Sequence, residues 1–84
     1  MQEDVFPEIA KAKNFVDLAY ETLEDLHKAS NNPNKDKILI DGKNKIHTAW
    51  GLHQSADTSS QLTNSYANMI IAAGECASKL IGKT

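Results

Sequence analysis

The chain has 84 residues, enough for one small domain, so residues 1–84 are treated as a single unit. Nine basic and eleven acidic residues give a net charge of −2, which argues against binding to a nucleic acid polymer or an anionic membrane. A domain this small buries only a modest share of its surface, so self-association is an expected source of stability.

The first predicted helix runs from about residue 6 to residue 29, with Pro7 tolerated in its first turn. Leu18 departs from the apolar spacing of this helix, because it falls on the polar arc opposite the other apolar residues. It is either an ordinary exposed leucine or a contact with a second subunit, and we take it as the candidate interface residue. The remaining apolar positions alternate at three and four residues, which is typical of a helix that packs on other helices: Ile9, Ala12, Val16, Ala19, Leu23 and Leu26.

Residues 30–34 are rich in serine, asparagine and proline, and they predict a turn. Pro33 disfavours helix at the residue before it. Asn34 or Asp36 is expected to cap the helix that follows.

Residues 37–45 are open to two interpretations. Ile38-Leu39-Ile40 followed by Asp41-Gly42 is typical of a strand entering a hairpin turn, but the chain offers no third strand to support it. The alternative is a helix that contains Gly42, at a cost of about 1 kcal/mol relative to alanine. We favour the helix, because the alternating spacing continues through this region and beyond it: Leu39, Gly42, Ile46, Ala49, His53 and Ala56.

Residues 57–61 combine low helix propensity with capping chemistry, since Thr58 and Gln61 have the spacing of a capping box. The last predicted helix follows and ends at Gly82. We call the stripe of apolar residues that packs on the other helices the seam. The seam of this helix is expected to consist of Leu62, Tyr66, Met69, Ala73, Cys76 and Leu80.

These elements predict an all-α fold. We expect a small antiparallel three-helix bundle that forms an oligomer. A helical hairpin with one long second helix is the alternative, because no proline or glycine interrupts the chain between Leu52 and Ala73.

The sequence holds no residue set typical of a metal site or a catalytic centre. His47 and His53 are six positions apart, which places them about 240° apart on a helix, so they do not share a face. The single cysteine, Cys76, lies in an apolar seam, where a thiol is inert. We therefore predict no metal, no cofactor and no enzymatic activity.

The location predicted for the chain is the cytoplasm. One cysteine forms no intrachain disulfide, and no apolar run approaches the roughly 18 residues that would span a membrane. Residues 1–4 are acidic and lead into no apolar stretch, unlike a secretory signal.

One cluster combines an aromatic platform, hydroxyl and amide groups and positive charge, and such a set can stack a base and hold a phosphate. The alternative is a partly buried tryptophan flanked by solvated polar residues. The candidate ligand-binding residues are Lys43, Lys45, His47, Thr48, Trp50 and Gln54.

A belt of neutral polar residues opens the last helix, and such residues lower helix propensity. They either satisfy a partner helix or a polar ligand, or they form an ordinary surface. The belt consists of Ser59, Ser60, Thr63, Asn64, Ser65 and Asn68.

The run from Ile46 to Ala56 resembles part of a phage family of small helical-hairpin sponges that sequester cyclic oligonucleotides and so blunt bacterial immunity. The likeness lies in the stretch Thr48-Ala49-Trp50 after a charged first helix. This chain lacks the arginine expected near Ser55 and adds about 28 residues after Ala56. No binding residue is therefore transferred from the family.

The functional hypothesis is a non-enzymatic binding protein of phage or mobile-element origin. It would act as a homo-oligomer that engages or sequesters a host protein or a small anionic, nucleotide-like ligand. Nine lysines without an arginine, together with frequent asparagine, suggest an AT-rich coding sequence consistent with that origin. The alternative hypothesis is a structural or assembly subunit of a helical complex.

Overall fold

The computed structural model describes the backbone of residues 7–82 and the side chains of residues 11–82. Within this range the chain forms three helices, α2 (Pro7–Ala29), α3 (Lys35–Gln54) and α4 (Ser59–Ile81), and no strand. The predicted three-helix architecture is confirmed. The alternative with one long second helix is wrong, because a turn separates α3 from α4. The seam position predicted at Ile9 lies outside the described side chains.

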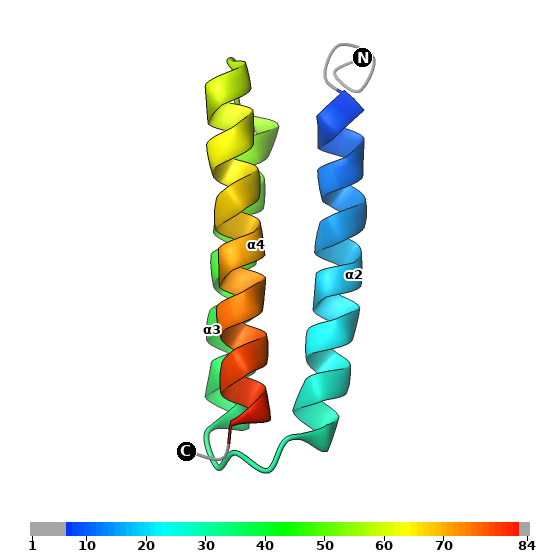
Figure 1. Cartoon of the computed structure of the whole chain (residues 1–84), viewed down its shortest axis with the longest axis vertical. Helices are drawn as coiled ribbons and strands as arrows, with labels where there is room; N and C mark the ends of the chain where they lie inside the picture. The colour runs from blue at the N-terminus through cyan, green and yellow to red at the C-terminus, as the bar shows by residue number, and fades with distance from the viewer. Residues whose placement is uncertain (1–6, 83–84) are drawn as a thin grey trace.

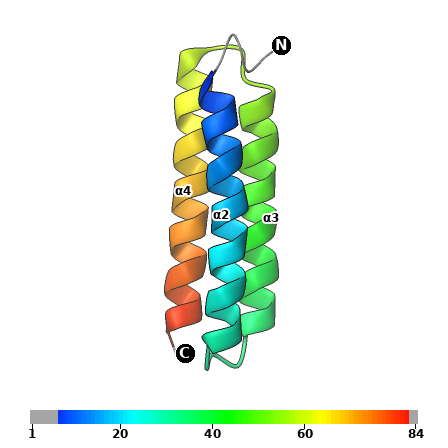
Figure 2. The ribbon, with the colours of Figure 1, turned by 90° about the vertical axis from the view of Figure 1, so that its right-hand side faces the viewer.

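The three helices run along the long axis and alternate in direction, so that α2 and α4 are parallel and α3 is antiparallel to both (Figure 1). Turned by 90°, the ribbon shows α2 in front of α3 and α4 and between them (Figure 2). The contact between α3 and α4 is the most extensive of the three. The molecule is therefore a tight antiparallel pair, α3–α4, with α2 laid along one side.

Most described positions of the predicted seams on α2 and α3 are buried, whereas Leu26, Leu39 and Ala56 are half-buried. On α4 the prediction needs a correction, because Ser65 and Ala72 are buried whereas Tyr66 and Ala73 are half-buried. The core of α4 turns toward α3, where small side chains permit the closer approach. The Tyr66 ring instead reaches sideways to α2 and meets the Phe15 ring edge-on, with the centroids 5.7 Å apart.

The region that allowed a strand is helical throughout, so the hairpin interpretation of residues 37–45 is wrong. Gly42 is buried at the closest approach of α3 to α4. A Cβ atom added there would lie 2.3 Å from Cys76 Sγ and 2.6 Å from Cys76 Cβ. The Cys76 thiol donates to the carbonyl of Ile38 at 3.4 Å. Gly42 is therefore a packing requirement of the α3–α4 contact.

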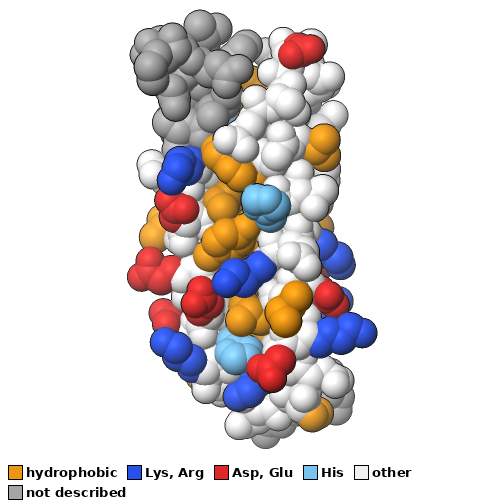
Figure 3. Space-filling view, turned by 180° about the vertical axis from the view of Figure 1, so that it is seen from behind, with side chains coloured by type: hydrophobic (Ala, Val, Ile, Leu, Met, Phe, Trp, Pro, Cys, Tyr) orange, Lys and Arg blue, Asp and Glu red, His pale blue; other side chains and the backbone are white. Residues whose placement is uncertain are grey.

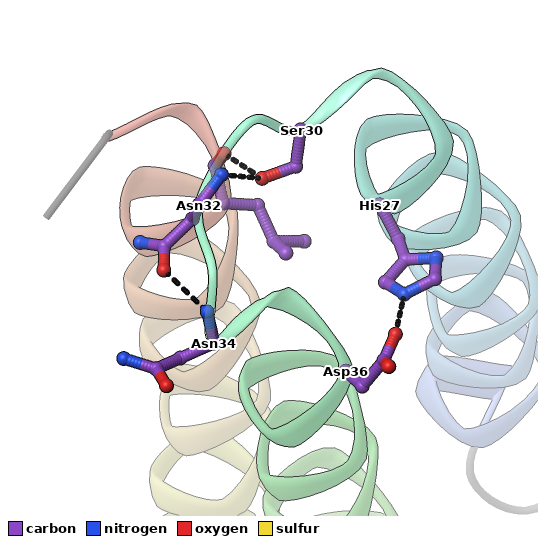
Figure 4. Close-up of polar contacts among 6 residues, drawn as sticks. His27, Ser30, Asn32, Asn34 and Asp36 are labelled. Carbon is purple, nitrogen blue, oxygen red and sulfur yellow. Dashed lines mark hydrogen bonds and ion pairs between the residues drawn. The ribbon is translucent and has the colours of Figure 1, made fainter.

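The turn between α2 and α3 caps the C-terminal end of α4 (Figure 4). Asn32 is only 3% exposed, and its Nδ2 donates to the carbonyls of Lys79 (3.1 Å) and Gly82 (3.2 Å). Ser30 Oγ donates to the carbonyl of Leu80 at 2.7 Å. These bonds satisfy carbonyls that a helix end leaves without partners, and they join the first turn to the last helix.

Asn34 occupies the N-cap position of α3, but its side chain makes no capping bond. The bond comes from the preceding turn instead, where Asn32 Oδ1 accepts from the Asn34 backbone N–H at 2.8 Å. The other predicted cap, Asp36, pairs with His27 of α2 at 2.6 Å (Figure 4). The predicted helix start is confirmed, whereas the predicted capping chemistry is wrong.

The turn between α3 and α4 has the predicted capping residues. Thr58 Oγ1 accepts from the Gln61 backbone N–H at 3.1 Å. The Gln61 side chain returns to the backbone N–H of Asp57 at 2.7 Å, one residue before the position in the standard motif.

Candidate functional site

An apolar groove runs between α2 and α4 and is the most distinctive surface feature of the described chain. Its central part has a volume of about 340 Å³. Two large side chains stand at its rims, Leu18 of α2 at 63% exposure and Ile70 of α4 at 47%. The groove is lined by Phe15, Leu18, Ala19, Thr22, Leu23, Ile70, Ala73, Gly74 and Ala77.

Small residues of α4 make the groove deep enough to admit another side chain. A Cβ atom added at Gly74 would have no neighbouring atom within 4 Å, so the space over this residue is open. Ala73 and Ala77 flank it on the same lining. The rim residue Ile70 therefore stands one helical turn from an open, exposed position at Gly74.

The edge of α4 that faces this groove carries no charge. Only two of the 23 residues of α4 are charged, Glu75 and Lys79. Both line a different cavity, of about 420 Å³, on the α3 side of the helix. An exposed helix edge without charge is unusual for a surface that meets only water, and such patches mark sites of interaction.

The face formed by α2 and α3 is built differently. A stripe of hydrophobic side chains lies between these helices, with lysine and acidic side chains along and across it (Figure 3). Lys43 Nζ pairs with Glu24 at 3.3 Å, and His27 pairs with Asp36 at 2.6 Å. The Lys43–Glu24 ion pair and the His27–Asp36 contact therefore both join α2 to α3, and among the described residues no salt bridge joins α2 to α4.

Leu18, the predicted interface residue, lies at the rim of the apolar groove. The sequence pattern placed it on the polar arc of α2, and the structure shows that this position borders α4. Its exposed side chain is thus part of a continuous apolar surface.

Two of the predicted ligand-binding residues have partners within the chain. The Lys43 ammonium pairs with Glu24, lies 5.4 Å from the centre of the Tyr20 ring and is partly buried. Trp50 is half-buried, and its ring stacks on His53 with the centroids 6.0 Å apart. One face of the indole and the charge of Lys43 already have partners within the chain.

The other four residues are exposed and lie on two sides of α3. Lys45 and Thr48 line a shallow cavity against α4, of about 510 Å³. By helical spacing, His47 and Gln54 lie within about 40° of Lys43 and about 160–180° from Lys45. The structure therefore divides the six predicted residues between two edges of α3.

The polar belt of α4 has one buried member. Ser65 is 5% exposed, and its Oγ lies 2.7 Å from His53 Nδ1. Because the single hydroxyl hydrogen is donated to the carbonyl of Gln61 at 2.8 Å, we assign the proton of the imidazole to Nδ1, which then donates to Ser65. His53 Nε2 is left as a buried acceptor with no partner among the described residues.

The His53–Ser65 contact was not expected from the sequence, which placed these residues in separate features. It joins α3 to α4 near the turn that connects these two helices. The remaining residues of the polar belt are exposed. The contact therefore has a structural role between the two helices.

The Cys76 thiol is held between α3 and α4 in a form unsuited to nucleophilic chemistry. Burial raises its pKa, Asp41 adds to the effect, and Lys79 and Lys45 oppose it. The side chain is 3% exposed, so the thiolate is both disfavoured and poorly accessible.

Residues 11–82 contain no group of three or more His, Cys, Asp or Glu side chains arranged to hold a metal ion. None of the three described helices is long and apolar enough to cross a lipid bilayer.

Comparisons of the chain with models of known protein families, with curated proteins and with solved structures found no match.

Proposed function

We propose that this is a non-enzymatic binding protein that takes up an amphipathic helix in the groove between α2 and α4. The observation that carries the proposal is the apolar lining of this groove between two parallel helices. It is supported by the contrast with the α2–α3 face, where charged and polar side chains lie along and across the apolar stripe (Figure 3).

The geometry suits a helix. Two parallel helices side by side offer a long groove into which the side-chain ridge of a third helix fits. Gly74, Ala73 and Ala77 lower one wall of the groove, so the backbone of a bound helix can come close. A helix that runs antiparallel to α2 and α4 also places its dipole favourably against theirs.

The apolar groove predicts an occupant with a leucine- or isoleucine-rich stripe at helical spacing. Polar side chains on its opposite face would remain in water. Burial of Leu18 and Ile70 removes the two large apolar side chains that the groove exposes to water.

The test uses an environment-sensitive fluorophore attached to a Thr22→Cys variant at the groove, at nanomolar protein concentration. The probe is an 18-residue peptide of leucine and lysine with leucine at helical spacing. We expect saturable peptide binding with a blue shift of the fluorophore's emission. We expect no shift when the same fluorophore is attached through Gly51→Cys, because Gly51 is exposed on α3.

The blocking variant is Gly74→Lys, which places a charged side chain in the groove. Its matched control is Gly51→Lys, since neither glycine has an atom within 4 Å of an added Cβ and only Gly74 lines the groove. We expect Gly74→Lys to weaken peptide binding at least about tenfold, which corresponds to about 1.4 kcal/mol. Equal binding by both lysine variants would overturn the proposal.

A further inference from the structure

We infer that the face of α2 and α4 that holds the groove packs on the same face of a second copy of this chain, whose side chains enter the groove. The two copies are related by a two-fold axis that crosses α2 at Leu18. The inference rests on the proposed function, and it names the partner. An axis perpendicular to the helices packs α2 antiparallel against α2 of the partner subunit. It packs α4 against α4 of the partner subunit in the same way.

The charges on α2 are arranged for this symmetry. Lys11 and Asp25 are both exposed, and each lies seven residues from Leu18 on the same edge of the helix. Seven residues are two turns, or about 10.5 Å of helix. A two-fold axis at Leu18 therefore brings Lys11 opposite Asp25 of the partner subunit, and it forms the same pair a second time.

The shape of α4 fits the same axis. Leu18 lines the groove together with Ile70 and Gly74, so these three residues lie at similar heights along the bundle. An axis that crosses α4 midway between Ile70 and Gly74 places each Ile70 over the partner's Gly74. The exposed isoleucine then packs over a position that carries no side chain, and the contact is self-complementary, as a two-fold interface requires.

The available area is sufficient. A helix of 23 residues is about 35 Å long, and two helices about 10 Å apart present a face about 20 Å wide, or roughly 700 Å². Stable dimers bury about 800 Å² per partner. A two-fold interface of this kind is closed, so the complex stops at two chains and does not grow into a filament.

The experiment measures the dimer dissociation constant by sedimentation equilibrium of the full chain, whose mass is 9.2 kDa. Lys11→Asp and Asp25→Lys each place like charges opposite one another at two symmetric positions. We expect each to weaken the dimer about tenfold. The double variant restores opposite charges, and we expect its dissociation constant to return close to that of the wild type.

Each of these substitutions lies on an exposed position, and helicity by circular dichroism serves as the folding control. Restoration by the double variant is the decisive result, because residues 11 and 25 lie about 21 Å apart within one helix and do not compensate each other there. Failure of restoration overturns the antiparallel pairing.

A second measurement locates the axis directly. In a Leu18→Cys variant the two new thiols face each other across the axis, so mild oxidation is expected to give a disulfide-linked dimer. A Gly51→Cys variant serves as the control and is expected to form no disulfide-linked dimer. The native Cys76 is buried and does not interfere.

The outcomes separate this inference from the proposed function. A monomeric mass at all concentrations with no cross-link at residue 18 overturns the inference, while binding of the leucine–lysine peptide would leave the proposed function standing. Failure of both the peptide and the dimer measurements overturns both.

Discussion

Gly42→Ala tests the close contact between α3 and α4. By helix propensity alone the substitution stabilises the helix by about 1 kcal/mol. In the structure, however, the new methyl group would lie 2.3 Å from Cys76 Sγ and 2.6 Å from Cys76 Cβ. Carbon atoms in contact are normally about 3.5–4.0 Å apart, so the two helices must separate by about 1 Å.

Overpacking of this kind costs about 1–3 kcal/mol. The Cβ of Cys76 cannot rotate away, so we place the cost at the upper end and expect a net destabilisation of about 2 kcal/mol. For a domain of this size that lowers Tm by about 8–16 °C. The assay is thermal unfolding followed by circular dichroism at a fixed protein concentration.

The matched control is Gly51→Ala, where an added Cβ meets no atom within 4 Å, and we expect Tm to rise. A double variant, Gly42→Ala with Cys76→Gly, removes both atoms that clash, so its loss of stability should be smaller than the sum of the single losses. The reasoning is refuted if Gly42→Ala proves as stable as Gly51→Ala.

Three further predictions concern buried polar groups. Asn32→Ala removes the bonds to the carbonyls at the end of α4 and should lower the free energy of unfolding in urea by about 1–3 kcal/mol. Asn31 is exposed, so Asn31→Ala should change this free energy little. Equal effects of the two substitutions would contradict the capping role of Asn32. Ser65→Ala leaves both nitrogens of His53 without a partner and should lower the free energy of unfolding by about 1–3 kcal/mol. His53→Phe removes the unpaired Nε2 and should cost less. The reverse order would show that the assigned His53–Ser65 hydrogen bond is wrong. Burial raises the pKa of the Cys76 thiol in the folded state, so above about pH 8.5 the unfolded chain loses this proton first and the free energy of unfolding falls as pH rises. Cys76→Ala should reduce that slope, and an unchanged slope would show that the thiol does not contribute to it.

The helices of the first half were predictable because their apolar spacing is regular. Four described positions of the first seam, Ala12, Val16, Ala19 and Leu23, are buried as expected. The seam of α3 was also correct through Gly42 and His53, although neither is an ordinary core residue. Periodicity carries this information because one face of a helix must leave water whatever it packs against.

The rotation of α4 was not predictable from its own pattern. Its sequence offers two overlapping apolar stripes, one through Tyr66 and Ala73 and one through Ser65 and Ala72. Each would make a plausible seam for an isolated pair of helices. The choice between them depends on α3, where buried Gly42 and Ala49 leave room for α4 to pack closely.

The candidate site followed from the sequence only in part. Leu18 stood out as a break in the pattern, but its neighbours Ile70 and Gly74 come from a helix more than fifty residues away. An unusual lack of charge along α4 was the signal that could have identified this surface. Ligand binding by the predicted cluster around Trp50 stays a prediction, to be tested by titrating cyclic dinucleotides against the fluorescence of the single tryptophan.

The sequence by itself indicated the helical segments and which face of α2 and of α3 is buried, because these depend on local propensity and on spacing along one element. It left residues 37–45 open to a strand, and it left the stretch from Leu52 to Ala73 open to one continuous helix. The tertiary structure decided that α2 and α4 lie parallel with an apolar groove between them, and that the turn at Asn32 caps the end of α4. Those features depend on contacts between residues about fifty positions apart, and the periodicity of a single helix does not encode which neighbour its edges will meet.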